Sequence, residues 1–185
     1  YGISKTILIE EKWNCVIRCA TPAVIERATD IGHDHYFHWL GADGGIMFRV
    51  NACKGLRLFN LSLNGYDKSF NSQYYTGRTQ GVTGVVFGPA KSPTGFATDI
   101  VVDSLCMTHV HDGLILGEVA DNGPDVRTIY FNHLAVFDFA HRGVVMQSGN
   151  LATITLMNPS LYTHRTDGKK ALACIEGRGG ELLSI

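Results

Sequence analysis

Three short stretches at nearly equal intervals decide the fold. Residues 84–87 read Gly-Val-Val-Phe, residues 113–116 read Gly-Leu-Ile-Leu, and residues 143–146 read Gly-Val-Val-Met. An earlier copy begins at Gly45 as Gly-Ile-Met-Phe, and a later one begins at Ala171 as Ala-Leu-Ala-Cys. An apolar segment that returns at intervals of roughly 27–39 residues predicts one structural unit repeated along the chain.

Each repeat contains two further apolar stretches. The second stretch runs through Leu56–Asn60, Ile100–Asp103, Ile129–Asn132 and Ile154–Asn158, and the third begins at Leu61, Leu105, Leu134 and Leu161. We therefore expect three short strands per repeat. Each second stretch ends in Asn or Asp, and we expect these four side chains to stack at one corner and to hydrogen-bond along the stack.

These repeats predict an all-β fold, a single-stranded parallel β-helix (a β-solenoid) with about three strands per coil. One coil cannot bury its own apolar face, but coils stacked about 4.8 Å apart bury a common core. We interpret residues 1–45 as entry coils and residues 46–185 as regular coils, the last one incomplete, in one segment of a longer chain. A β-sandwich is the alternative, because Asn64-Gly65, Asp112-Gly113, Asn122-Gly123 and Asp167-Gly168 are hairpin-type dipeptides.

Composition excludes several classes of protein. The 185 residues are 45% hydrophobic and 18% charged, with a net charge of −1, which fits one domain with a real core and not a disordered chain. There is no Lys/Arg run and no apolar run of the length that a membrane span needs. The five cysteines contain no CxxC pair, which argues against a zinc site of that kind. Cys53, Cys106 and Cys174 lie in apolar alternation, and we expect them to be buried thiols.

The pattern resembles a known family. Tyr1-Gly-Ile-Ser-Lys-Thr-Ile-Leu-Ile, Cys15-Val-Ile-Arg-Cys, Ile46-Met-Phe-Arg-Val and the stretch from Leu56 to Gly65 resemble the entry coils of pectate-lyase-like proteins. The resemblance implies a right-handed parallel β-helix, as in polysaccharide lyases, glycoside hydrolases and trimeric bacteriophage tailspikes. The chain contains neither the Asp-Asp nor the His-Gly dipeptide of polygalacturonase-type members. The resemblance therefore concerns the fold more than the chemistry.

Two loops are candidate sites. The stretch 64–81 contains Tyr66, Tyr74, Tyr75 and Arg78, a mixture of aromatic and polar groups that suits sugar rings. The other interpretation is a self-packed surface loop or a contact between subunits. The stretch 117–127 contains the carboxylates Glu118, Asp121 and Asp125. We interpret them as an acid/base pair, as a cation site, or as exposed charges that contribute only to solubility.

A fourth carboxylate, Glu176, follows a repeat strand at a point that we expect to be equivalent to Glu118, two coils away. Two coils separate side chains by about 9.6 Å, near the upper limit for the carboxylate pair of an inverting glycosidase. We therefore take Glu118, Asp121, Asp125 and Glu176 as the candidate catalytic residues.

Histidines form a third candidate group. His109, His111, His141 and His164 precede the corners of successive coils, so stacking places them in one stripe. A histidine beside a carboxylate is a general base, a metal ligand or a hydrogen-bonded surface group. Because the spacing matches no metal-ligand pattern, we expect a surface stripe with no metal or cofactor, in which His111 and His141 contact substrate.

Two functions follow as expectations. The first is a tailspike-like depolymerase segment that binds and cleaves a cell-surface polysaccharide as a hydrolase or lyase. The second is a non-catalytic structural or receptor-binding β-helix of a tail fibre or surface adhesin. The family resemblance implies a homotrimer on a virion tail or at a cell surface, with a polysaccharide as partner. We expect neither nucleic-acid binding nor membrane insertion.

Overall fold

The computed structural model describes residues 2–19, 37–65, 81–88, 96–117, 125–147, 151–162, 173–177 and 183–184, and every regular element in these ranges is a β-strand. Sheet A consists of β1 (Gly2–Ile3), β3 (Val16–Arg18), β4 (Phe37–Trp39), β6 (Cys53–Lys54), β7 (Arg57–Asn64), β9 (Phe96–Thr108), β11 (Asp125–Phe137), β13 (Leu151–Met157), β14 (Ser160–Tyr162) and β16 (Leu183–Ser184). Sheet B consists of β2 (Ile7–Glu10), β5 (Ile46–Asn51), β8 (Thr83–Phe87), β10 (Asp112–Leu116), β12 (Arg142–Met146) and β15 (Ala173–Gly177). No helix in these ranges has the length and apolar character needed to cross a membrane.

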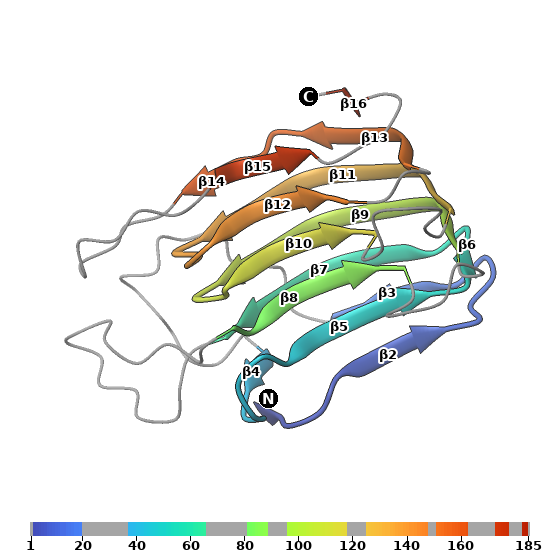
Figure 1. Ribbon diagram of the computed structural model, residues 1–185. Helices are drawn as coiled ribbons and strands as arrows, with labels where there is room; N and C mark the ends of the chain where they lie inside the picture. Colours follow the sequence, from blue (N-terminus) through green and yellow to red (C-terminus); the bar gives the residue numbers. More distant parts are fainter. Residues whose placement is uncertain are drawn as a thin grey trace.

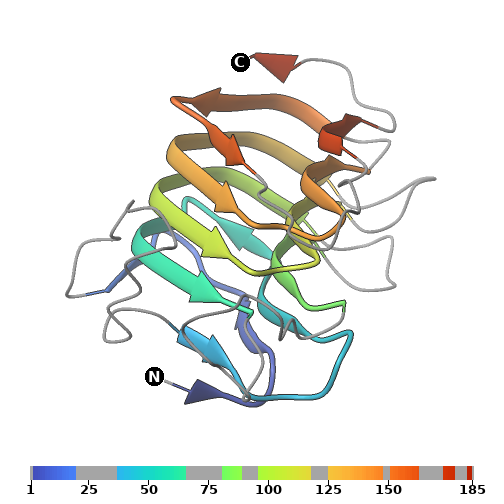
Figure 2. The ribbon, with the colours of Figure 1, turned by 90° about the vertical axis from the view of Figure 1, so that its left-hand side faces the viewer.

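The chain passes alternately through the two sheets. Strands β5, β8, β10, β12 and β15 lie in sheet B, and β7, β9, β11 and β13 lie between them in sequence but belong to sheet A. We call one passage through both sheets a circuit. The two sheets face each other, and successive circuits lie one above the other from the N-terminal to the C-terminal end (Figures 1 and 2).

Every strand pair among the described residues is parallel, because each strand pairs with its counterpart one circuit away. The prediction of an all-β fold with parallel strands is therefore confirmed. Parallel pairing does not fit the hairpins of a β-sandwich. Asp112-Gly113, for example, lies inside β10 and forms no hairpin turn.

The predicted repeats agree with the register in the middle of the chain. Ile129 is paired with Ile100 and with Ile154, and Leu105 is paired with Leu61 and with Leu134. The glycine-led segments at 84, 113 and 143 also coincide, since Asp112 is paired with both Thr83 and Arg142. The apolar repeat therefore correctly identified the residues that stack.

The outer copies of the repeat are shifted from the predicted alignment. Phe48, not Ile46, is paired with Val85, so Met47 lies beside Gly84. Gly45 has another role: a Cβ on it would lie 2.1 Å from the Trp39 ring.

At the C-terminal end, Ala173 is paired with Arg142, so Cys174 takes the position that we expected for Ala171. Leu161 is likewise paired with Val136 and not with Leu134. A short apolar run carries no side chain that marks its register, so repeat spacing alone misplaced these copies.

Residues with a left-handed backbone conformation (positive φ) occur every five residues along the long strands and bend them. The φ angle is positive at Asp99, Ser104 and His109 in one circuit and at Thr128, His133 and Asp138 in the next. Each is followed by a buried side chain, as at Ile100, Leu105 and Val110. The second and third stretches, expected as separate strands, are thus joined in the 13-residue strands β9 and β11.

The expected stack of Asn and Asp side chains is split between two neighbouring columns. Asn60 and Asn158 have left-handed φ angles of 56° and 50° and align with Ser104 and His133. Asp103 and Asn132 lie one residue earlier in their circuits, and Asn132 Nδ2 donates a hydrogen bond of 3.1 Å to Asp103 Oδ1. Asn tolerates the left-handed conformation better than most residues, which explains its place in the first column.

The core lies between the two sheets. It is almost wholly aliphatic and aromatic, and Phe87 of sheet B meets Phe131 of sheet A edge to face, with ring centroids 5.8 Å apart. Gly84, Gly113 and Gly143 form a column where sheet B approaches side chains of sheet A: a Cβ on Gly113 would lie 2.5 Å from Val136 Cγ1. The glycines are therefore required by close packing.

The cysteine prediction is correct at two positions of three. Cys53 and Cys106 are buried, whereas Cys174 in β15 is exposed. Burial raises the pKa of the Cys106 thiol to about 12. The five thiols are all free.

Candidate functional site

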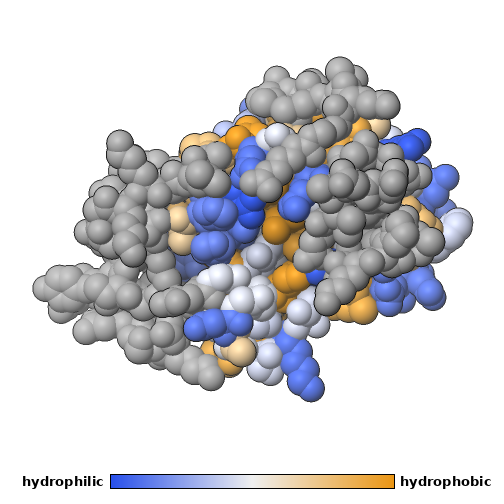
Figure 3. All heavy atoms as spheres, viewed as in Figure 1, coloured by the Kyte–Doolittle hydropathy of each residue, from blue (hydrophilic) through white to orange (hydrophobic). Residues whose placement is uncertain are grey.

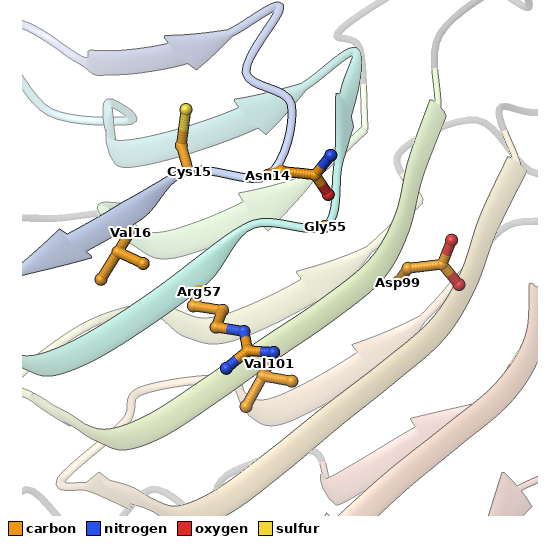
Figure 4. Close-up of a pocket in the computed structure, with 7 residues that line it drawn as sticks. All are labelled: Asn14, Cys15, Val16, Gly55, Arg57, Asp99 and Val101. Atoms are coloured by element: carbon orange, nitrogen blue, oxygen red, sulfur yellow. The ribbon is translucent and has the colours of Figure 1, made fainter.

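The outer face of sheet A has a shallow cavity of about 470 Å³ near the N-terminal circuits. Its lining residues come from three successive circuits: Asn14, Cys15, Val16, Gly55, Arg57, Asp99 and Val101. Figure 4 shows these side chains along the strands, with the Arg57 guanidinium extending toward Val101. A second cavity of about 320 Å³ shares Val16 and is lined also by Arg18, Phe59, Asn60 and Asp103.

Strand register explains why these residues meet. Val16 is paired with Arg57, and Arg57 is paired with Val101. One residue earlier or later along these strands, Leu56, Leu58, Ile100 and Val102 are buried in the core. Because side chains alternate between the two faces of a strand, Arg57 and Val101 face outward.

A second outward column lies beside the first. Arg18 is paired with Phe59, and Phe59 is paired with Asp103. The two cavities adjoin at Val16, and we call them together the sheet-A groove, defined as the residues lining the two cavities.

The sheet-A groove combines cationic, anionic and apolar groups. Lys54 Nζ lies 3.7 Å from Asp99 Oδ2, and His133 Nδ1 lies 3.5 Å from Asp103 Oδ1. The side chains of Arg18 and Arg57 make no ion pair or hydrogen bond with the described residues. Two guanidinium groups are therefore available to a ligand, beside apolar side chains that pack against a flat surface.

A second cluster lies where strands β10 and β12 of sheet B begin. Arg142 Nε donates a hydrogen bond of 2.8 Å to Asp112 Oδ1, and Arg142 Nη2 donates one of 2.9 Å to Asp112 Oδ2. Arg142 Nη1 donates a third bond of 3.1 Å to Glu176 Oε2 on β15. One arginine thus links the carboxylates of two other circuits.

The two histidines that precede these strands are stacked. The ring centroids of His111 and His141 are 4.8 Å apart and their planes differ by 24°. His141 Nδ1 donates to Asp112 Oδ1 at 3.1 Å, and His141 N donates to His111 O at 2.8 Å. The predicted stripe is confirmed for this pair, and His164 lies outside the described residues.

Electrostatics keeps Asp112 ionised. Burial of its carboxyl group opposes ionisation, but the hydrogen bonds and positive charge of Arg142, with the two histidines, outweigh this effect and hold the pKa of Asp112 below its ordinary value. The hydrogen bonds from Arg142 to Asp112 raise the pKa of Arg142 despite its partial burial. A carboxylate held in this way is a poor general acid near neutral pH.

The face around this cluster is amphipathic. Hydrophilic residues gather along the side of sheet B where β10 and β12 begin, and hydrophobic residues are visible toward its middle (Figure 3). A small hydrophobic cluster separate from the main core, consisting of Val86, Ile115 and Val145, lies on β8, β10 and β12 and is itself buried. The polar cluster therefore shares β10 and β12 with a buried apolar cluster.

His109 belongs to a different environment from the stacked pair. It is buried, its Nδ1 lies 2.9 Å from Thr108 Oγ1, and its Nε2 lies 3.9 Å from Asp138 Oδ2. His109 and Asp138 are the left-handed residues of adjacent circuits. This side chain therefore stabilises a bend and does not join the predicted surface stripe.

Most of the predicted site residues fall on segments without a described conformation. Tyr66, Tyr74, Tyr75, Arg78, Glu118 and Asp121 lie outside the described residues. Asp125 begins β11, where its backbone is paired with Phe96. Glu176 is paired with Val145, which is paired with Ile115, so the expected equivalence of Glu176 with Glu118 is wrong.

Sequence reasoning missed the sheet-A groove. Arg57 and Asp99 lie on different circuits, and no local motif connects them. The sequence contains one signal for Arg57: it alternates with Leu56 and Leu58, which are buried, and this alternation marks Arg57 as outward-facing. No protein-family model, curated protein or solved structure matches the chain.

Proposed function

We propose that the chain is a right-handed parallel β-helix of the pectate-lyase-like type, and that it binds a polysaccharide as a segment of a tailspike-like depolymerase. The alternating passage through two parallel sheets supports the β-helix, since each circuit pairs in register with the next. The resemblance of the entry segments supports the right-handed form and the family. A homotrimer on a virion tail or at a cell surface belongs to the same proposal.

The observation that carries polysaccharide binding is the sheet-A groove. It extends over successive circuits, and its guanidinium, carboxylate and amide groups lie beside Val16, Val101 and Phe59. Sugar rings present apolar C–H faces and hydroxyl groups at regular intervals, and such a groove offers partners for both. A long polymer is therefore a better match than a compact ligand, for which a deeper pocket is typical.

Cleavage is assigned to the carboxylates Glu118, Asp121, Asp125 and Glu176. Glu176 has the described environment of a charged hydrogen-bond acceptor, because Arg142 donates to it at 3.1 Å. This contact favours a role in holding Arg142 over a role as proton donor. Glu118, Asp121 and Asp125 are the stronger candidates for acid and base.

The test uses a panel of neutral and acidic bacterial and plant polysaccharides. Chain length is followed by size exclusion, and absorbance in the unsaturated-uronate band distinguishes a lyase from a hydrolase. Glu118→Gln and Asp121→Asn are expected to abolish cleavage and to leave binding intact. Unchanged cleavage in both variants would show that these two residues are not catalytic.

Binding is tested separately with Arg57→Ala. Loss of a charged hydrogen-bond donor is expected to weaken polysaccharide binding by about tenfold or more. Arg127→Ala is the matched control, because Arg127 is an exposed arginine on β11 outside both cavities. Equal affinity of the two variants for a bound polysaccharide would contradict the sheet-A groove as the binding surface.

A non-catalytic binding or structural β-helix is the second candidate. The observation that favours it is that Asp112 and Glu176, the carboxylates of the sheet-B cluster, both accept hydrogen bonds from Arg142. Carboxylates neutralised in this way stabilise the stack of circuits and do not transfer protons readily. Binding of a polysaccharide without any shortening of it would select this function.

A further inference from the structure

The sheet-B cluster has a second chemical property besides its ion pairs. His111, Asp112 and His141 each offer one ligand atom, and these atoms all lie within 4.8 Å of one another. We propose that these three residues bind a divalent transition-metal ion, with Zn²⁺ as the ion that fits best. This inference does not rest on the polysaccharide binding proposed for the sheet-A groove, which lies on the other sheet.

The donor set matches the ion. Two imidazole nitrogens and one carboxylate oxygen are ligands that Zn²⁺ accepts, and three protein ligands leave a position for water. The three residues come from the starts of adjacent strands, since Asp112 is paired with Arg142 and the histidines precede these two residues. The site is therefore fixed by the strand ladder, and its histidines come from two circuits.

The spacing is close to that of a coordinated ion. Ligands at about 2.0–2.2 Å from one tetrahedral ion lie about 3.3–3.6 Å apart. His141 Nδ1 and Asp112 Oδ1 are already 3.1 Å apart. The cluster thus needs its most widely separated ligand atoms, which are within 4.8 Å, to approach by up to about 1.5 Å, which rotation of the imidazole rings supplies.

Arg142 does not block the carboxylate. Asp112 Oδ1 accepts from Arg142 Nε and His141 Nδ1, whereas Asp112 Oδ2 accepts from Arg142 Nη2. A bound ion would take the place of the proton between His141 Nδ1 and Asp112 Oδ1, and this proton would be released to solvent, while both hydrogen bonds from Arg142 to the carboxylate remain. Hydrogen bonds from a neighbouring residue commonly orient a ligating carboxylate, which is the role the geometry gives to Arg142.

The charge balance of the cluster also favours a cation. Asp112 and Glu176 contribute two negative charges, Arg142 contributes one positive charge, and the histidines are neutral as ligands. The side chain of His141 is 35% exposed, so an ion can reach the site from solvent. The side chain of Asp112 is only 7% exposed, so its bond to an ion is little weakened by competing water.

Isothermal titration of the chelator-treated protein with Zn²⁺ tests the proposal. His111→Gln and His141→Gln are expected to weaken this site at least about tenfold, and the double variant is expected to lose one equivalent of bound Zn²⁺. Co²⁺ titration gives a second readout, because the visible absorption of bound Co²⁺ reports its ligands. Cooperative thermal unfolding of each variant shows that it is folded.

His133→Gln is the matched control, because His133 is also a histidine near a carboxylate but lies on sheet A, 3.5 Å from Asp103. It is expected to keep the stoichiometry and affinity of the unaltered protein. The proposal is overturned if the unaltered protein binds no Zn²⁺, or if the double variant binds as many equivalents with the same affinity and gives the same Co²⁺ spectrum.

Discussion

Gly113 approaches the backbone of the next circuit so closely that no side chain fits between them. A Cβ built on Gly113 would lie 2.5 Å from the carbonyl oxygen of Gly143. Because this neighbour is backbone and is held in a strand ladder, it cannot move away as the end of a flexible side chain would. The glycine column is therefore a condition for stacking the circuits at their observed separation.

We expect Gly113→Ala to lower the free energy of unfolding by about 2–3 kcal/mol, because the added methyl group overpacks both the core and the ladder. Urea denaturation measures the change. Gly177→Ala is the matched control, since a Cβ on Gly177 would have no neighbour within 4 Å. An equal effect of the two substitutions would contradict the steric explanation.

The left-handed threonines predict a substitution that stabilises the protein. Thr128 is exposed and has a φ angle of 53°, which is unfavourable for a β-branched residue. We expect Thr128→Asn to raise the free energy of unfolding by about 0.5–1 kcal/mol, because Asn tolerates this conformation. Thr155→Asn is the control, because Thr155 does not have a positive φ angle; this substitution should leave the free energy of unfolding unchanged or lower it. An increase as large as that of Thr128→Asn would refute the explanation.

The ion pair between Asp112 and Arg142 predicts a pH-dependent effect. The pKa of Asp112 is lowered in the folded state, so its carboxylate stabilises the fold above its unfolded pKa of about 3.9. This stabilisation is lost as the pH falls through the lower folded pKa. Asp112→Asn should therefore cost about 2 kcal/mol at pH 7, from its lost charged hydrogen bonds, and progressively less below about pH 4.

Urea denaturation at several pH values, in buffer with a chelator so that only protons act, measures this difference. Asp103→Asn is the control, because the side chain of Asp103 is 35% exposed and makes no ion pair or hydrogen bond with an arginine among the described residues. A difference between Asp112→Asn and the unaltered protein that is as large at pH 3 as at pH 7 would exclude the ion pair as its cause.

Thiol labelling separates the two environments of cysteine. The pKa of Cys106 is about 12, so only about one molecule in ten thousand has the thiolate at pH 8, and the side chain is also buried. Cys174 is exposed. We expect iodoacetamide to label Cys174 in the folded protein and Cys106 only after denaturation, as read by peptide mass spectrometry. Rapid labelling of Cys106 without denaturant would contradict its burial.

The sequence was sufficient for the parallel, all-β architecture because the buried positions repeat. Ile100, Ile129 and Ile154 occupy one column, and their spacing alone aligned them correctly. The same logic failed at Gly45, because that glycine accommodates Trp39 and does not belong to the column of Gly84. Identical residues can be required by different neighbours, and only the three-dimensional contacts distinguish the two cases.

Candidate sites were less predictable than the core. His111 and His141 were expected in one stripe because both precede a repeat strand, and they do stack. Arg57 and Asp99 carry no such repeat, and they line one cavity because Arg57 is paired with Val101, two residues after Asp99. Outward side chains do not need to match from one circuit to the next, so their arrangement cannot be derived from periodicity.

The five-residue interval between left-handed residues has a consequence for how the chain tolerates changes in length. One residue inserted between Asp99 and Ser104 would shift every later side chain of that strand to the opposite face. Insertion or deletion of five residues would shift the strand by one bend relative to the adjacent circuits. The later side chains would keep their inward or outward direction. We therefore expect these strands to tolerate insertions and deletions of five residues, which correspond to one bend, or of a complete circuit.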